Sequence, residues 1–207
     1  MSSFVFEEIE CSHCHRMLKF TMFKSINVTL DPDYKEKVLD LSLFRERCPD
    51  CGNVTVVQYG FLYHDMDLHY MIDVIWDPDH LFGTSDPMLK NWIGNLNSEP
   101  PYRFRNVFGY RELLEKIHIF DSGLNDYAVE MLKAVIRKEY DIPQEQLLAF
   151  QRIQGDEIVF STADRNGTVR EISSNLYSQA LEVITPKLPP EDEHRYVDEC
   201  LFRGNAD

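Results

Sequence analysis

Two cysteine pairs constrain the fold of this chain more than any other feature. The first pair is Cys11-Ser-His-Cys14, and the second is Cys48-Pro-Asp-Cys51, which is followed by Gly52. The C-x-x-C spacing lets one tight turn direct two sulfur atoms to a common point, and two such turns complete a tetrahedron around Zn²⁺. The pattern therefore predicts a structural zinc site with all four cysteines as ligands. A closed four-thiolate site leaves no open position for a substrate.

The same cysteines allow a second interpretation, as redox-active dithiols. A C-x-x-C turn can lower a thiol pKa and form a disulfide, and oxidation of these pairs would then release the metal. The remaining cysteine, Cys200, has no partner in the pattern and is expected to be a free thiol. Metal binding in a reducing compartment explains four paired cysteines better than a disulfide framework does.

The charge of the chain bears on its partners. The sequence of 207 residues holds 21 Lys and Arg against 35 Asp and Glu, a formal net charge of −14. Such a surface repels phosphate backbones, which argues against nucleic acid as a partner and favours a protein with a basic surface. The first residues lack the features of a secretory signal, and no run of apolar residues is long enough to span a membrane. We therefore expect a cytoplasmic protein without a membrane segment.

The first part of the chain predicts mainly strands. Residues 26–30 alternate apolar and polar side chains, as a half-buried strand does. Asp31 is placed to cap a short amphipathic helix that begins at Pro32. Residues 54–63 and 68–76 predict two further strands after the second cysteine pair. One strand and one helix are thus inserted between the two cysteine turns.

The second part changes from helical to strand periodicity. Two segments each place their apolar side chains at helical spacing and together predict a helical hairpin, with the Glu and Lys side chains of the opposite face in solvent. A period of two after Pro143 predicts three short strands, and Ser173 or Ser174 is placed to cap a last helix. The helical segments are 110–117 and 124–136, and the strands are 147–153, 157–161 and 168–172.

These elements predict an α+β fold in two lobes. We expect a zinc-ribbon-like β domain over residues 1–80, with the inserted strand and helix described above. Residues 81–107 are rich in turn-forming dipeptides and are expected to be a linker. A helical hairpin with a small antiparallel sheet should occupy residues 108–190, and residues 191–207 should form an acidic tail.

Four further side chains are candidates for chemistry. His13 and His15 flank Cys14 and could contact the bound metal ligands or replace one of them. His64 and Asp65, close to Asp67 and His69, form the only cluster typical of acid–base or hard-metal chemistry. Because adjacent side chains diverge in extended backbone, the pair favours a structural turn over a catalytic site.

The chain resembles the CpXC proteins, a bacterial family named for its cysteine motifs. The resemblance covers about residues 5–140, and the first pair departs from the pattern because it lacks the proline of C-P-x-C. It implies a bacterial origin and a metal-binding cysteine domain, and it implies no particular activity. The matching segments are 11–14, 27–32, 37–39, 48–52, 62–65, 113–117, 119–124, 125–126 and 130–133.

The sequence favours a non-catalytic, zinc-stabilised protein-binding module. A specific form of this hypothesis is an immunity or inhibitor protein that blocks a basic toxin or nuclease. The alternatives are a metal-dependent enzyme that uses the region of His64 and Asp65, and a thiol redox sensor. No serine-based triad, phosphate-binding glycine loop or H-E-x-x-H motif supports an enzyme. The partner and the oligomeric state do not follow from the sequence.

Overall fold

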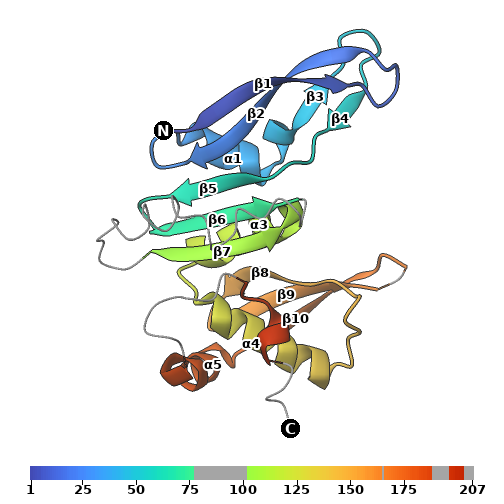
Figure 1. Cartoon of the computed structure of the whole chain (residues 1–207). Coiled ribbons are helices and arrows are strands. Elements are labelled where there is room, and N and C mark those ends of the chain that lie inside the picture. Colours follow the sequence, from blue (N-terminus) through green and yellow to red (C-terminus); the bar gives the residue numbers. More distant parts are fainter. Residues whose placement is uncertain (77–101, 165, 188–195, 203–207) are drawn as a thin grey trace. The chain divides into compact units, whose positions relative to one another are not determined.

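A computed structural model describes residues 1–76, 102–164, 166–187 and 196–202 of the chain (Figure 1). The fold is mixed α+β, as the sequence predicts. The chain divides into two compact units, Met1–Leu114 and Glu115–Asp207. No helix within the described ranges is long and apolar enough to cross a membrane.

The first unit is built on one five-stranded mixed sheet. Its strand order is β1-β2-β5-β6-β7, in which β1 pairs antiparallel with β2 and β2 runs parallel to β5. Strands β5 and β6 form an antiparallel hairpin, and β7 runs parallel to β6. The two hairpin strands are buried along most of their length, whereas β1 lies at the edge of the sheet and is largely exposed. The five strands are Ser3–Glu10 (β1), Met17–Asn27 (β2), Phe61–Asp65 (β5), Tyr70–Ile75 (β6) and Arg103–Phe108 (β7).

Between β2 and β5 the chain forms a helix and a second, smaller hairpin. Helix α1 covers Asp33–Leu39, and a short 3-10 turn follows at Ser42–Phe44. Strands β3 (Arg45–Arg47) and β4 (Val54–Val56) then pair antiparallel with each other. Helix α1 and strand β3 therefore lie between the two cysteine turns, in addition to β2.

An aromatic cluster joins this insertion to the main sheet. The rings of Phe44 and Tyr110 stack with centroids 4.2 Å apart, and Phe61 and Tyr59 lie against Phe44 at 5.3 and 5.8 Å. The hydroxyl of Tyr110 donates a hydrogen bond of 2.8 Å to the carbonyl of Val57. Because aromatic side chains bury large apolar areas, this cluster stabilises the contact between the insertion and the sheet.

The second unit combines helices with a three-stranded antiparallel sheet of order β10-β9-β8. Helix α3 begins in the first unit and ends in the second, and a turn at Gly123, with φ of 70°, separates it from α4. The elements are α3 (Gly109–Asp121), α4 (Asp126–Glu139), β8 (Leu148–Gln154), β9 (Glu157–Ala163), β10 (Val169–Ser174), α5 (Tyr177–Ile184) and the 3-10 turns Thr185–Lys187 and Glu199–Phe202.

Charged side chains are buried between the helices of this unit, where the sequence predicts a solvated face. The ammonium of Lys116 lies 3.1 Å from Asp126 and 3.2 Å from Glu130. The ammonium of Lys133 lies 2.9 Å from the other oxygen of Glu130 and 3.1 Å from Glu115. The expectation of solvent exposure is wrong because the C-terminal segment and β8 cover these positions, with Lys116 donating to the carbonyl of residue 197 at 2.6 Å.

The structure corrects several local predictions. Strand β1 has no counterpart in the sequence analysis, and residues 103–107, expected as linker, belong to β7. Asp31 does not cap α1; its carboxylate accepts the backbone N–H of Ser2 at 2.9 Å, and Pro32 takes the cap position. Helix α5 begins after Leu176, so neither Ser173 nor Ser174 is its cap residue. Linker residues 81–101 and most of the acidic tail lie outside the described ranges.

Candidate metal centre

The four cysteines of the two pairs lie in the turns of two antiparallel hairpins. Cys11 directly follows β1, and Cys14 lies three residues before the start of β2. Cys48 directly follows β3, and Cys51 lies in the same turn, shortly before β4. Figure 1 shows both turns at the same end of the first unit. Each hairpin thus presents its cysteines from a rigid base of paired strands.

The two turns use the same backbone hydrogen bonds. In the first, the N–H of Cys11 donates to the carbonyl of Arg16 at 2.8 Å, and the N–H of His15 donates to the carbonyl of Cys11 at 3.1 Å. In the second, the N–H of Cys48 donates to the carbonyl five residues further on at 2.8 Å, and Gly52 donates back to Cys48 at 2.9 Å. His15 and Gly52 hold equivalent positions, with φ of 61° and 73°. This left-handed conformation reverses the chain after the second cysteine of each pair.

The sulfur atoms have the spacing of a tetrahedral metal site. All four lie within 4.8 Å of one another. Two pairs across the turns are closer, with Cys11 and Cys51 at 3.7 Å and Cys14 and Cys48 at 3.6 Å. A regular tetrahedron with metal–sulfur bonds of about 2.3 Å has sulfur–sulfur edges of about 3.8 Å. A disulfide requires about 2.05 Å, so the cluster fits a metal ion and contains no disulfide.

The cluster is half enclosed by the protein. Cys11 and Cys48 are buried and pack with Leu18 and the partly buried Ile9 in a small hydrophobic cluster. The other two cysteines, Cys14 and Cys51, are exposed. An ion held here would contact the apolar base of the two hairpins on one side and face solvent on the other.

The backbone prepares one sulfur for metal binding. The N–H groups of Cys14 and His13 donate to the sulfur of Cys11 and lower its pKa from 9.0 to about 6. The N–H of Arg16 lowers the pKa of Cys14 as well, but the neighbouring thiols, Cys51 first, outweigh it and raise that pKa to about 12. The thiolate of Cys11 thus makes it harder for the neighbouring thiols to lose their protons. A metal cation that binds all four sulfur atoms must displace these protons.

Polar side chains connect the two turns around the cysteines. The N–H of Ser12 donates to the hydroxyl of Thr55 at 3.2 Å, and the amide of Asn53 donates to the hydroxyl of Ser12 at 2.9 Å. The guanidinium of Arg16 forms an ion pair with Asp50 across the turns. Sequence analysis does not identify these contacts, because they join residues about 40 positions apart and follow no local pattern.

The two histidines of the first turn lie outside the cluster of possible metal ligands. Within the described residues, the four cysteines form the only group of three or more His, Cys, Asp or Glu side chains that converge on one point. The imidazole Nδ1 of His15 lies 2.5 Å from the carboxylate of Glu10, on the surface. His13 contributes a backbone N–H to Cys11, and its side chain is exposed.

His64 is a buried side chain with polar neighbours. Its Nδ1 lies 3.3 Å from the amide nitrogen of Asn27, and its Nε2 lies 3.1 Å from the hydroxyl of Tyr102. Burial lowers the pKa of His64 to about 4, although the charge of Asp65 acts in the opposite direction. The ring is therefore neutral at pH 7 and ties β2 to β5.

Asp65 organises the turn between β5 and β6. Its Oδ1 accepts the N–H groups of Asp67 and Leu68 at 3.1 and 3.0 Å, and its Oδ2 lies 3.4 Å from the ammonium of Lys35. This geometry supports the structural turn that the sequence favours at His64 and Asp65. No convergent carboxylate or imidazole group forms beside them within the described residues.

Comparison with known proteins agrees with the cysteine pattern. A family model described as CpXC protein matches residues 9–133, which include both cysteine pairs and end within α4. No curated protein matches the chain, and no solved structure matches it.

Proposed function

The chain belongs to the CpXC family, and from this membership and its cysteine cluster we propose that it is a non-catalytic protein-binding module stabilised by one zinc ion. The four thiols are soft donors, which select Zn²⁺ over Mg²⁺ and Ca²⁺. Bound zinc would hold the two turns together and supply no open coordination position. Its apparent contribution of about 10–16 kcal/mol is as large as the whole stability of a typical domain.

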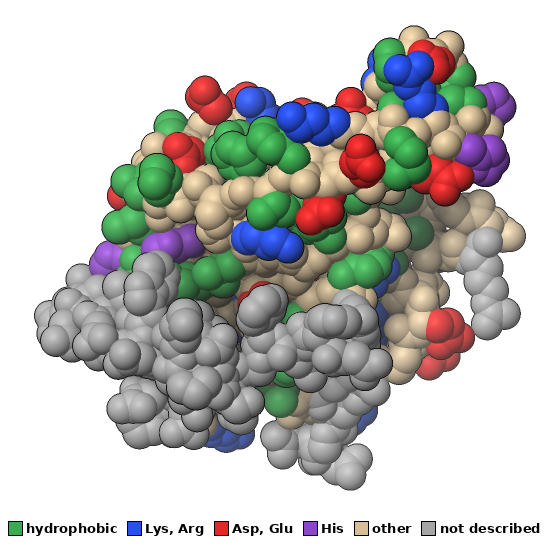
Figure 2. All heavy atoms as spheres, turned by 45° about the horizontal axis from the view of Figure 1, so that its top comes forward, with side chains coloured by type: hydrophobic (Ala, Val, Ile, Leu, Met, Phe, Trp, Pro, Cys, Tyr) green, Lys and Arg blue, Asp and Glu red, His purple; other side chains and the backbone are tan. Residues whose placement is uncertain are grey.

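The observation that carries the binding proposal is the exposed edge strand β1. Phe4 and Phe6 are 49% and 58% exposed, and no strand pairs with the outer edge of β1 within the described residues. Such an edge offers unpaired backbone groups to an added strand. Figure 2, in which the top of Figure 1 comes forward, has hydrophobic side chains beside acidic and basic ones on this side of the first unit.

The charges of β1 favour a basic partner. Glu7, Glu8 and Glu10 follow the two phenylalanines on the same strand. In a parallel, in-register pair, a second copy of this strand would bring glutamates against glutamates, which destabilises a β pair, whereas lysines or arginines of a partner would be favourable. An immunity or inhibitor protein that blocks a basic toxin or nuclease would need such an acidic binding strand.

The metal site and the edge strand are directly connected. The last residue of β1, Glu10, precedes Cys11, and Lys19 of β2 lies over the Phe6 ring at 3.9 Å. Zinc binding at Cys11 would therefore fix the end of the strand to which the partner adds. Loss of zinc should abolish partner binding even with Phe4 and Phe6 intact.

The proposal is tested by capture of a partner from the host. The zinc-loaded chain should retain a basic protein in stoichiometric amount, and the double variant Phe4→Ser with Phe6→Ser should lose it. The matched control is Val169→Ser, at an exposed apolar position of strand β10 that is 66% exposed. Equal retention by the double variant would place binding elsewhere and contradict the edge-strand proposal.

A thiol sensor is the alternative that a specific feature supports, because Cys14 and Cys51 are accessible to oxidants. Mild peroxide would then release zinc, and a reductant would restore it. Retention of zinc under peroxide favours the binding module.

A further inference from the structure

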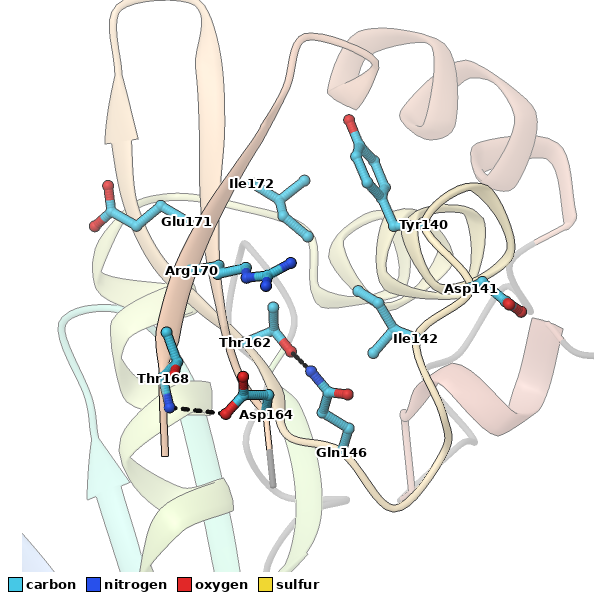
Figure 3. Close-up of a pocket in the computed structure, with 10 residues that line it drawn as sticks. All are labelled: Tyr140, Asp141, Ile142, Gln146, Thr162, Asp164, Thr168, Arg170, Glu171 and Ile172. Atoms are coloured by element: carbon cyan, nitrogen blue, oxygen red, sulfur yellow. Dashed lines mark hydrogen bonds between the residues drawn. The ribbon is translucent and has the colours of Figure 1, made fainter. Parts of the chain in front are cut away.

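A pocket of about 390 Å³ lies in the second unit, between the end of α4 and strands β9 and β10 (Figure 3). This volume is in the range of sites for small molecules. Its wall includes the apolar side chains of Ile142 and Ile172 and the ring of Tyr140. A hydrogen bond of 2.9 Å from the amide of Gln146 to the hydroxyl of Thr162 closes one side.

Arg170, an exposed side chain, supplies a cation at the wall of the pocket. Figure 3 shows its guanidinium directed into the space that faces Tyr140 and Ile142. Arg170 forms no hydrogen bond or ion pair within the described part of the chain. Its neighbour Glu171 points away from the pocket and forms an ion pair of 2.6 Å with Arg152. The guanidinium is therefore available to a carboxylate, which it can bind through two parallel hydrogen bonds.

Asp164 supplies an anion beside Arg170. One carboxylate oxygen, Oδ1, accepts the N–H groups of Asn166 and Thr168, both at 2.9 Å. These contacts hold the pKa of Asp164 below its usual value, with the Thr168 N–H as the main cause, so the side chain is charged at neutral pH. The side chain of Thr168 and the charge of Arg170 act in the same direction on this pKa. A carboxylate has about four lone-pair sites on its two oxygens, so Oδ2 can still accept a hydrogen bond from an ammonium group.

We propose that this pocket binds a free α-amino acid with an apolar side chain. Its carboxylate would pair with Arg170, its ammonium with the Oδ2 of Asp164, and its side chain would lie against Ile142, Ile172 and Tyr140. The three parts of the pocket match the three parts of such a ligand. A simple carboxylate would use only the cation, and an amine only the anion. The site uses neither the cysteine cluster nor strand β1.

The test is a titration of the zinc-loaded full chain followed by ¹H–¹⁵N NMR. The probes are L-phenylalanine, 3-phenylpropionate, which lacks the amino group, and 2-phenylethylamine, which lacks the carboxylate. L-phenylalanine should shift the amide signals of residues 140–146 and 162–172. Each truncated probe should bind about tenfold more weakly, because one ionic contact is lost.

Two variants test the carboxylate contact of Arg170 and the ammonium contact of Asp164 separately. Arg170→Gln should weaken binding of L-phenylalanine and of 3-phenylpropionate by about tenfold each. Asp164→Asn keeps the acceptor oxygen for the two loop N–H groups, so it should weaken binding of the amino acid. It should not weaken binding of 3-phenylpropionate, because it removes a negative charge that repels the carboxylate of this probe. Lys187→Gln, which removes an exposed cation outside the pocket, is the matched control and should bind as the unaltered chain does.

Absence of amide shifts in these segments with L-phenylalanine would overturn the proposal, as would unchanged binding by Arg170→Gln. Equal affinity for L-phenylalanine and 3-phenylpropionate would show that Asp164 takes no part, and would overturn the assignment to an amino acid.

Discussion

At the scale of single residues, the two cysteine turns place different residues in their left-handed position. Gly52 and His15 have the same left-handed conformation, which costs a residue with a side chain about 1 kcal/mol relative to glycine. His15 has a contact to Glu10 that partly offsets this cost. The second turn has the less strained backbone.

Replacement of Gly52 by alanine should destabilise the zinc-loaded chain by about 1 kcal/mol. A Cβ at this position meets no atom within 4 Å, so the cost is conformational and not steric. Denaturant unfolding of the zinc-loaded chain measures it. Gly52→Asn is the control, because asparagine tolerates this conformation better. Equal losses for the two variants would contradict the conformational explanation.

His64 should make stability depend on pH. Its pKa is lowered from 6.5 to about 4 in the folded chain, so the unfolded state binds a proton that the folded state excludes. Stability due to this group is therefore constant above pH 6.5 and decreases as the pH falls from 6.5 toward 4. The loss should reach about 2 kcal/mol, after allowance for solvent near the ring.

The measurement is the urea midpoint of the zinc-loaded chain between pH 7.5 and pH 5.5, a range that limits loss of the metal and over which about 1 kcal/mol of the loss should be seen. His64→Gln, which retains a hydrogen-bonding amide, is the matched variant and should decrease less over the same range. An identical pH dependence in both proteins would assign the effect to other groups.

At the scale of elements, local pattern predicts part of the fold. The helices at 109–121 and 126–139 and the three strands of the second unit follow from periodicity and from turns such as the one after Gln154. Strand β7 does not follow from it, because Arg105 is 2% exposed within a segment rich in polar residues. Its pairing with β6 is a long-range contact that no local propensity encodes.

The candidate metal site is the part most fully predicted from the sequence. Its four sulfur ligands follow from spacing alone, and the structure brings them together. The contacts of Ser12 and Arg16 across the turns, and the edge position of β1, depend on how distant segments assemble. Neither could be predicted from a local pattern.

The backbone at Gly60 lies too close to strand β6 to leave room for a side chain. A Cβ on Gly60 would lie 2.6 Å from the backbone carbonyl oxygen of Val74, which cannot move without shifting the strand. Gly60→Ala should therefore cost about 1–3 kcal/mol in thermal or denaturant unfolding. Gly123→Asn, at an open turn position, should cost much less. A loss below 0.5 kcal/mol for Gly60→Ala would show that the strands have room to separate.

At the scale of the whole molecule, two units depend on different interactions. The first has the cysteine cluster, and the second has the buried network that joins Lys116 and Lys133 to three carboxylates. Burial raises the pKa of Glu115 in this network, although Lys133 acts in the opposite direction. The charges were expected in solvent because their burial depends on β8 and the C-terminal segment, which lie far away in the sequence.

Removal of one cation from the network should be costly. Lys133→Met removes the ion-pair partner of Glu115 and leaves Glu130 with Lys116 alone, so it should destabilise the second unit by about 3–5 kcal/mol. Hydrogen exchange of α4 in the zinc-loaded chain measures the loss. Lys187→Met, at an exposed position, should have little effect. Equal exchange in the two variants would show that the network is dispensable.

The most direct test of the zinc site is native mass spectrometry of the untagged chain purified from its own host. We predict one zinc ion per chain, its loss in Cys14→Ser, and its retention in Cys200→Ser, because Cys200 lies outside the C-x-x-C pairs. A chain that is folded and free of zinc, or one whose zinc survives Cys14→Ser, would contradict the four-cysteine site.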